Sequence, residues 1–93
     1  MESVWEIEKE WNWAMNTESI HFHLSDGQKR HTFDITRTAL VDYFHTEDTK
    51  EQALALFEQY KERIINLALK VLDESKGDEV HLIKLETCQR LGL

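Results

Sequence analysis

The longest run of regularly spaced apolar residues covers positions 49–76. On a helical wheel, its aliphatic and aromatic residues fill an arc roughly 220° wide, and its charged residues fill the remainder. A surface helix needs an apolar stripe of only about 100°, so the pattern predicts one long helix with neighbours on two sides. Thr49, with Gln52 three residues later, fits an N-terminal capping box, although Thr46 is also placed to cap an earlier start.

This expected helix carries two further predictions. Ile64 and Leu67 should be almost completely buried, as the core of a central helix would be. Gly77 stands where a glycine commonly ends a helix in a left-handed turn. We interpret the leucines and aromatic residues as core and not as a cofactor-binding motif.

Two segments with alternating apolar and polar residues predict a β-hairpin. Residues 20–25 and 30–35 both alternate as half-buried strands do. Between them, Asp26-Gly27 is the strongest short hairpin signal. A two-residue turn there gives the cross-strand pairs Leu24 with Lys29, Phe22 with His31, and Ile20 with Phe33. Directly opposed residues share a face of the sheet, so the turn and the alternation favour the same register.

The N-terminal segment has two readings. Ser3 with Glu6 resembles a capping box, and apolar residues at helical spacing follow it. Trp11, Trp13 and Met15 also alternate with period two. The segment after residue 10 therefore fits both a helix and an extended chain.

The remaining elements follow from shorter patterns. Thr36 is placed to cap a short helix, which must dock on the hairpin or on the long helix because it is too short to stand alone. Residues 80–85 predict a third strand, since they are rich in Val, Leu and Ile. Its apolar residues fall on both faces, which is typical of a strand covered on both sides or paired at an interface. Residues 87–91 are expected to form one closing turn.

This order of elements predicts an α+β fold in a single domain, residues 1–93. We expect a three-stranded, mostly antiparallel sheet, made of the hairpin plus the C-terminal strand, with helices packed on one face around one long helix. The opposite face of the sheet would carry His21, His23, Arg30, Thr32 and Asp34.

Composition limits the possible functions. Eleven basic and 18 acidic side chains give a formal net charge of −7, which argues against nucleic acid as a partner because phosphate contacts dominate such binding. The acidic N-terminus does not fit a signal peptide, and no apolar run approaches the roughly 20 residues of a membrane span. The single cysteine, Cys88, cannot form a disulfide within the chain. We therefore expect a soluble cytoplasmic protein.

Several segments together resemble a known family. They are Ile20 to Thr36, Ala39-Leu40, Asp42, Phe44, Phe57, Arg63-Ile64, Leu67-Ala68, Leu72 and Val80 to Leu82. Across residues 13–85 the pattern is similar to short bacterial proteins of unknown function, the domain of unknown function 1488. The resemblance implies a small α+β protein and supplies no activity. Members often have a cysteine near the end of the second strand, where this chain has Phe33, so a role for that thiol does not carry over.

The sharpest chemical motif is His21-x-His23. Residues i and i+2 of a strand face the same side, so both imidazoles are placed to bind one metal ion. A tetrahedral site needs further ligands, for which Asp34 and His81 are the candidates. The alternative interpretation is two solvent-facing histidines on an open sheet face.

The tryptophans suggest a second kind of site. If residues 4–15 formed one helix, Trp5 and Trp13 would lie off its apolar stripe and face water, which would favour an interface because tryptophan is enriched in binding hot spots. The alternative is that the helix breaks after Glu10, so that the chain turns Trp13 inward and Trp5, Trp11 and Trp13 seal one end of the core.

No pattern supports catalysis. Cys88 has no nucleophile signature around it, and no pair of carboxylates is placed for acid–base chemistry. The leading prediction is a non-enzymatic protein-interaction or regulatory module that forms a homodimer or binds a protein partner, with no cofactor and no membrane. The alternative is a small metal- or ligand-binding protein that uses the histidine-bearing sheet face.

Overall fold

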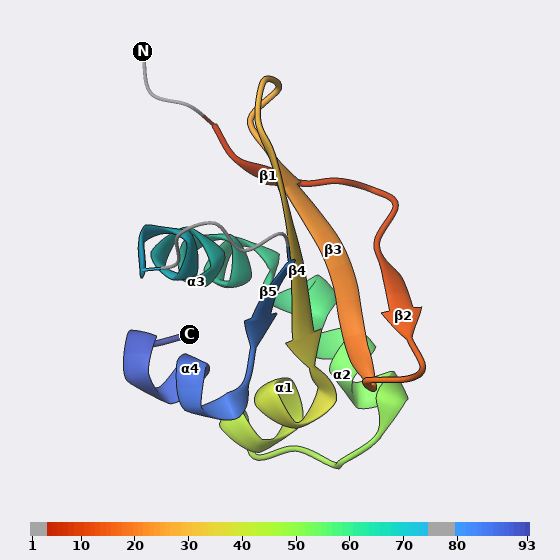
Figure 1. The fold of residues 1–93 in the computed structure, drawn as a ribbon. Coiled ribbons are helices and arrows are strands. Elements are labelled where there is room, and N and C mark those ends of the chain that lie inside the picture. The colour runs from red at the N-terminus through yellow and green to blue at the C-terminus, as the bar shows by residue number, and fades with distance from the viewer. Residues whose placement is uncertain (1–3, 75–79) are drawn as a thin grey trace.

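The computed structural model describes residues 4–74 and 80–93 and has the α+β architecture that the sequence predicts (Figure 1). In chain order the elements are β1 (Glu6–Ile7), β2 (Asn12–Ala14), β3 (Ser19–Ser25), β4 (Arg30–Thr36), α1 (Arg37–Tyr43), α2 (Lys50–Gln59), α3 (Lys61–Glu74), β5 (Val80–Ile83) and α4 (Leu85–Leu91). No helix in these two ranges combines the length and the apolar character that a membrane span requires.

The sheet is larger and more mixed than the predicted three antiparallel strands. Its order is β1-β3-β4-β5, and β2 pairs with the same edge of β3 as β1 does, nearer the N-terminal end of β3. The third predicted strand exists as β5 but runs parallel to β4. The helices α1, α2 and α3 lie between β4 and β5 in the chain, and a crossover of this kind is what permits parallel pairing.

The hairpin is present, but its predicted register is wrong by two residues. Ser25 pairs with Arg30 and Phe22 pairs with Phe33, so the loop contains four residues and not two. The Asp26 side chain explains the longer loop, because its Oδ1 accepts hydrogen bonds from the backbone amides of both Gln28 and Lys29. A shift of two residues keeps every side chain on its predicted face of the sheet.

The N-terminal helix is absent, and the extended alternative holds. β1 pairs with residues 24–25 of β3 and β2 pairs with residues 19–21, so both short strands satisfy backbone groups along one edge of β3. Trp13 lies opposite Ile20, which places it on the same face as the core residues of β3. The proposed cap residue Ser3 lies outside the described residues.

The predicted long helix is two helices that meet at Tyr60. The backbone amide of Tyr60 donates to Leu56, and its carbonyl accepts from Ile64, so the helical bonding continues through a local bend with φ −112° and ψ 30°. The Tyr60 ring stacks on Phe44, with centroids 4.3 Å apart. The bend accounts for the wide apolar arc, because α2 packs against α1 while α3 packs against β1, β5 and α4.

Two of the three helix-start predictions are confirmed, at Thr36 and Thr49, while Glu6 of the third lies in the strand β1. Thr36 caps α1 by accepting from the Ala39 amide at 3.0 Å, and Thr49 caps α2 by accepting from the Gln52 amide at 3.1 Å. These bonds satisfy amides that the helix itself leaves unpaired. The predicted helix end at Gly77 lies outside the described residues.

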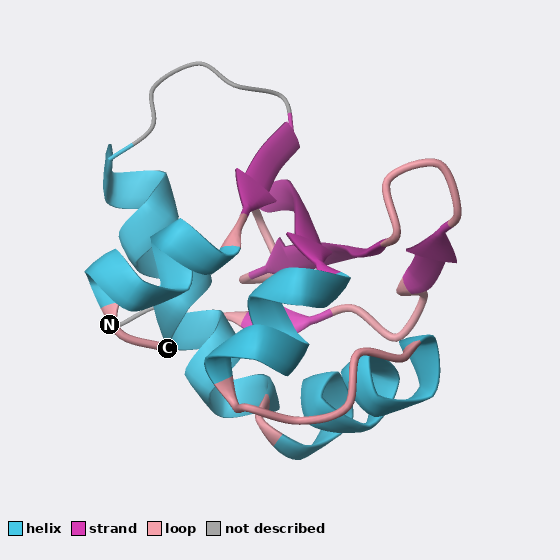
Figure 2. Cartoon of the chain, turned by 90° about the horizontal axis from the view of Figure 1, so that it is seen from below, coloured by secondary structure: helices cyan, strands magenta, loops and turns pink. Residues whose placement is uncertain are grey.

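The core lies between the sheet and the helices, which gather on one side of the central strands (Figure 2). Ile64 and Leu67 are buried as predicted. The other fully buried large side chains come from β3, β4, α1, α2, β5 and α4: Phe22, Phe33, Phe57, Ile20, Leu24, Ile35, Leu40, Ile83, Val41 and Cys88. Covering only one face of the sheet leaves the opposite face, which bears the histidines, uncovered by helices.

Candidate functional site

The uncovered sheet face is built by the alternation of β3 and β4. Core residues of β3 are buried at every second position, and the residues between them are only partly buried. The cross-strand pairs on this face are His21 with Asp34 and His23 with Thr32. The structure therefore brings together four of the five residues predicted for this face as two neighbouring pairs.

The first pair is an aspartate–histidine contact. The Nδ1 atom of His21 lies 2.5 Å from Oδ1 of Asp34. An ionised carboxylate only accepts hydrogen bonds, so Nδ1 carries the proton and donates it. In the neutral imidazole, Nε2 of His21 then carries no proton and has a free lone pair.

The second pair holds the other imidazole. The Nδ1 atom of His23 lies 2.9 Å from the Thr32 hydroxyl oxygen. The two imidazole rings stand almost perpendicular, with centroids 5.2 Å apart. Desolvation, followed by the nearby positive charge of Arg30 and by His21, lowers the pKa of His23 below its ordinary value, so this ring is neutral at pH 7.

His81 does not join this group, contrary to the predicted ligand set. It pairs with Phe33 in the β4–β5 ladder, which places it on the covered face of the sheet. Its side chain is buried, its ring packs 5.2 Å from that of Phe33, and its Nδ1 atom is buried without a hydrogen-bond partner. Within the part of the chain that the structure describes, no group of three or more His, Cys, Asp or Glu side chains is arranged to hold a metal ion.

The two tryptophans predicted as an interface are half-buried and pack against the core. Trp5 lies against His31, with ring centroids 5.6 Å apart, and the Nζ atom of Lys50 lies 5.5 Å from the Trp13 ring. The prediction that both indoles face water depended on a helix that is absent. A role for Trp5 and Trp13 in an interface stays a prediction, without that argument for it.

Cys88 is unsuited to nucleophilic chemistry. It is fully buried in α4, and desolvation raises the pKa of its thiol to about 11. The thiolate is the reactive form, so this cysteine stays protonated and inert near neutral pH.

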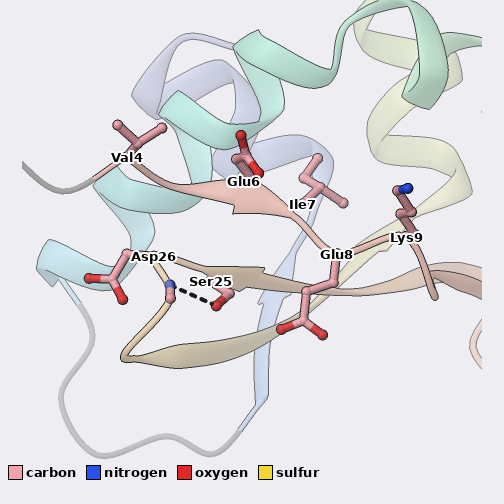
Figure 3. Close-up of a pocket in the computed structure, with 8 residues that line it drawn as sticks. Val4, Glu6, Ile7, Glu8, Lys9, Ser25 and Asp26 are labelled. Atoms are coloured by element: carbon pink, nitrogen blue, oxygen red, sulfur yellow. Dashed lines mark hydrogen bonds between the residues drawn. The ribbon is translucent and has the colours of Figure 1, made fainter.

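An open cleft of about 500 Å³ lies where β1 meets the end of the β3–β4 hairpin. Figure 3 shows Val4, Ile7 and Lys9 on one wall and Ser25 and Asp26 on the other. The lining also includes the carboxylates of Glu6 and Glu8. With three carboxylates against one lysine, the cleft disfavours phosphate and other anionic ligands.

Sequence reasoning missed two exposed residues on the same sheet face as the histidines. Val80 and Leu82 lie opposite Thr32 and Asp34 in the β4–β5 ladder, which puts them on the uncovered face. Their side chains are 47% and 46% exposed. The signal was the apolar character of both faces of this strand. It left open which residues would be exposed, because the pairing with β4 decides that.

Comparisons with known proteins agree on one family. The family described as "Protein of unknown function (DUF1488)" matches residues 8–84. The fold is similar to a crystal structure of a protein of unknown function from the DUF1488 family of Shewanella loihica PV-4. That comparison has a TM-score of 0.71 and 22% sequence identity, and it covers 89% of this chain and 94% of the other. Among curated proteins, none matches.

Proposed function

Because the chain belongs to the DUF1488 family, whose description assigns no activity, we propose a function from the structure itself. The protein is a non-enzymatic interaction module that forms a homodimer along β5, at the end of the uncovered sheet face. The observation that carries this proposal is the exposure of Val80 and Leu82 on an end strand of the sheet.

The position of β5 supports self-association. Among the described residues, β5 pairs with β4 on one side, and no strand pairs with its other side. An end strand of this kind presents backbone amide and carbonyl groups to another strand. Two copies that add their β5 strands antiparallel about a two-fold axis would extend the sheet without a break.

The side chains fit such a pairing. With the two-fold axis at His81, Val80 of one protomer lies opposite Leu82 of the partner subunit, and the reverse pair forms by symmetry. Burying exposed aliphatic surface supplies about 25 cal/mol for each Å² removed from water. The strand is only four residues long, so we expect a weak dimer whose population depends on concentration.

Binding, as opposed to catalysis, is supported by the chemistry of the described residues. The thiol of Cys88 is buried and protonated. His21 bonds to Asp34, and His23 bonds to Thr32. The hydroxyl of Thr32 is therefore bonded to a histidine that makes no hydrogen bond to a carboxylate of the described residues. A triad arrangement would instead chain a nucleophile, a base and a carboxylate together.

The test is the solution mass of the full chain, measured by light scattering over a range of concentrations. The wild type should shift from monomer to dimer as concentration rises, and the double variant Val80→Lys, Leu82→Lys should stay monomeric. Met15→Lys is the matched control, because Met15 is 80% exposed and lies beyond β2, away from β5. A wild type that stays monomeric at millimolar concentration, or a Lys double variant that still dimerises, overturns the proposal.

A further inference from the structure

The His21–His23 pair has a ring spacing that fits two ligands of one metal ion. The two residues lie on one face of β3 with ring centroids 5.2 Å apart. Zinc–nitrogen bonds of about 2.0–2.1 Å with tetrahedral angles place the centres of two bound imidazoles about 5 Å apart. The observed spacing therefore already matches two imidazoles that share one ion.

The hydrogen bonds of the two rings strengthen this reading. A histidine that binds a metal through one nitrogen usually donates its other N–H to a carboxylate, a carbonyl or another acceptor, which fixes the ring and its tautomer. Here both Nδ1 atoms already have partners, Asp34 for His21 and Thr32 for His23. When the Thr32 hydroxyl accepts from Nδ1 of His23, as Asp34 does from His21, both Nε2 atoms are available as ligands, and no hydrogen bond from the described residues occupies them.

From these contacts we infer that His21 and His23 bind one divalent transition-metal ion through their Nε2 atoms, while Asp34 and Thr32 orient the two rings. Imidazole ligands select zinc, copper or nickel over magnesium and calcium, which prefer oxygen. The Asp34 carboxylate also offsets part of the charge of the ion. Arg30, two residues before Thr32 on the same face of β4, is paired with Glu8 at 3.0 Å.

The described part of the chain supplies two ligands only. No third His, Cys, Asp or Glu completes a group there, and His81 faces the covered side of the sheet. Water therefore occupies the other coordination positions, and the ion is open to a further ligand. Two histidines give weaker binding than a closed four-ligand site.

The experiment is calorimetric titration of the untagged full chain with zinc chloride and, separately, with copper chloride. One ion should bind per chain. His21→Ala and His23→Ala should each weaken binding at least 10-fold, and Asp34→Asn and Thr32→Val should weaken it by about 10-fold, since they change only the orienting partners. The matched control is His45→Asn, which removes an exposed imidazole between α1 and α2 and should leave binding unchanged.

Two additional measurements keep the result unambiguous. The circular dichroism spectrum of each variant without metal shows whether it folds. Nitrogen-15 NMR of the wild-type imidazoles then reports the ligands directly, with the Nε2 resonances of His21 and His23 moving on addition of zinc. Absence of binding at 1 mM zinc, or binding that survives both alanine substitutions, overturns the inference. The Val80→Lys, Leu82→Lys chain should still bind the metal, so this experiment tests metal binding independently of the proposed dimer.

Discussion

Phe22 and Phe33 stack across the β3–β4 ladder, with ring centroids 5.3 Å apart and planes inclined by 16°. Both rings are fully buried, and Phe57 of α2 packs against Phe22 at 5.3 Å. The pair therefore joins the hairpin to the helical layer and holds the register in which residue 22 faces residue 33.

Truncating either ring should be costly. Phe22→Ala and Phe33→Ala should each lower the free energy of unfolding by about 3–5 kcal/mol, because a buried aromatic ring leaves a cavity. Urea denaturation followed by circular dichroism measures this. The double variant should lose less than the sum by about 0.5–1.5 kcal/mol, the coupling typical of a stacked pair. Strict additivity would contradict the stack.

The centre of α3 should be equally sensitive. Ile64→Ala and Leu67→Ala should each cost about 2–5 kcal/mol, since both side chains are buried among core residues. Ile65→Ala is the control, because Ile65 is only partly buried and should cost less. A loss below about 1 kcal/mol at both buried positions would mean that α3 is not central to the core.

The buried thiol predicts a pH dependence of stability. The pKa of Cys88 is raised from 9.0 to about 11, so the unfolded chain loses this proton first as the pH rises. The contribution of the protonated thiol is complete below pH 9 and is lost as the pH rises towards 11, at up to about 1.4 kcal/mol per pH unit.

Comparing urea denaturation of the wild type and Cys88→Ala at pH 8, 9 and 10 isolates this effect. The wild type should lose more stability than the variant above pH 9. The thiol should also react slowly with Ellman's reagent in the folded chain and rapidly in 8 M urea. Fast reaction in the folded chain would show that the thiol is accessible.

Substituting Trp5 and Trp13 shows whether the two indoles belong to the core or to an interface. Because Trp5 and Trp13 pack against the core, we expect Trp5→Ser and Trp13→Ser each to destabilise the monomer by about 1–3 kcal/mol. Thermal unfolding measures the loss, and light scattering measures the mass. Variants that keep the wild-type melting temperature but lose the dimer would instead place the two indoles in an interface.

Salt should strengthen the proposed dimer. Each chain carries a formal charge of −7, so two copies repel each other, while the contact at Val80 and Leu82 is apolar. Raising the ionic strength shortens the screening length from about 10 Å at 0.1 M to about 3 Å at 1 M, which reduces the repulsion without weakening the apolar contact. Sedimentation equilibrium should therefore give a lower dissociation constant at 1 M sodium chloride. A higher constant would indicate an interface held by ion pairs.

Local pattern was enough for the hairpin and the helix starts. The alternation of residues 20–25 and 30–35 assigns each side chain to a face, and even the two-residue error in register preserved that assignment. Thr36 and Thr49 were identified as caps because a cap depends only on residues within one turn. The turn length was not predictable from Asp26-Gly27, since the Asp26 side chain bonds two later amides and stabilises a longer loop.

Long-range pairing decided what local pattern left open. The N-terminal segment fits a helix or a strand on its own, and the free edge of β3 selects the extended form by supplying hydrogen-bond partners. The bend at Tyr60 follows from two sets of neighbours that lie far away in sequence.

The sequence by itself determined the α+β class, the core positions of the hairpin and of α3, and the placement of His21 and His23 on one face. The tertiary structure decided which residues join them. The register in which β5 pairs with β4 places His81 on the covered face of the sheet and places Val80 and Leu82 on the uncovered face. Alternation sorts the residues of a strand into two faces without saying which face meets the core. The direction of β5 depends on a crossover through three helices, which no local propensity encodes.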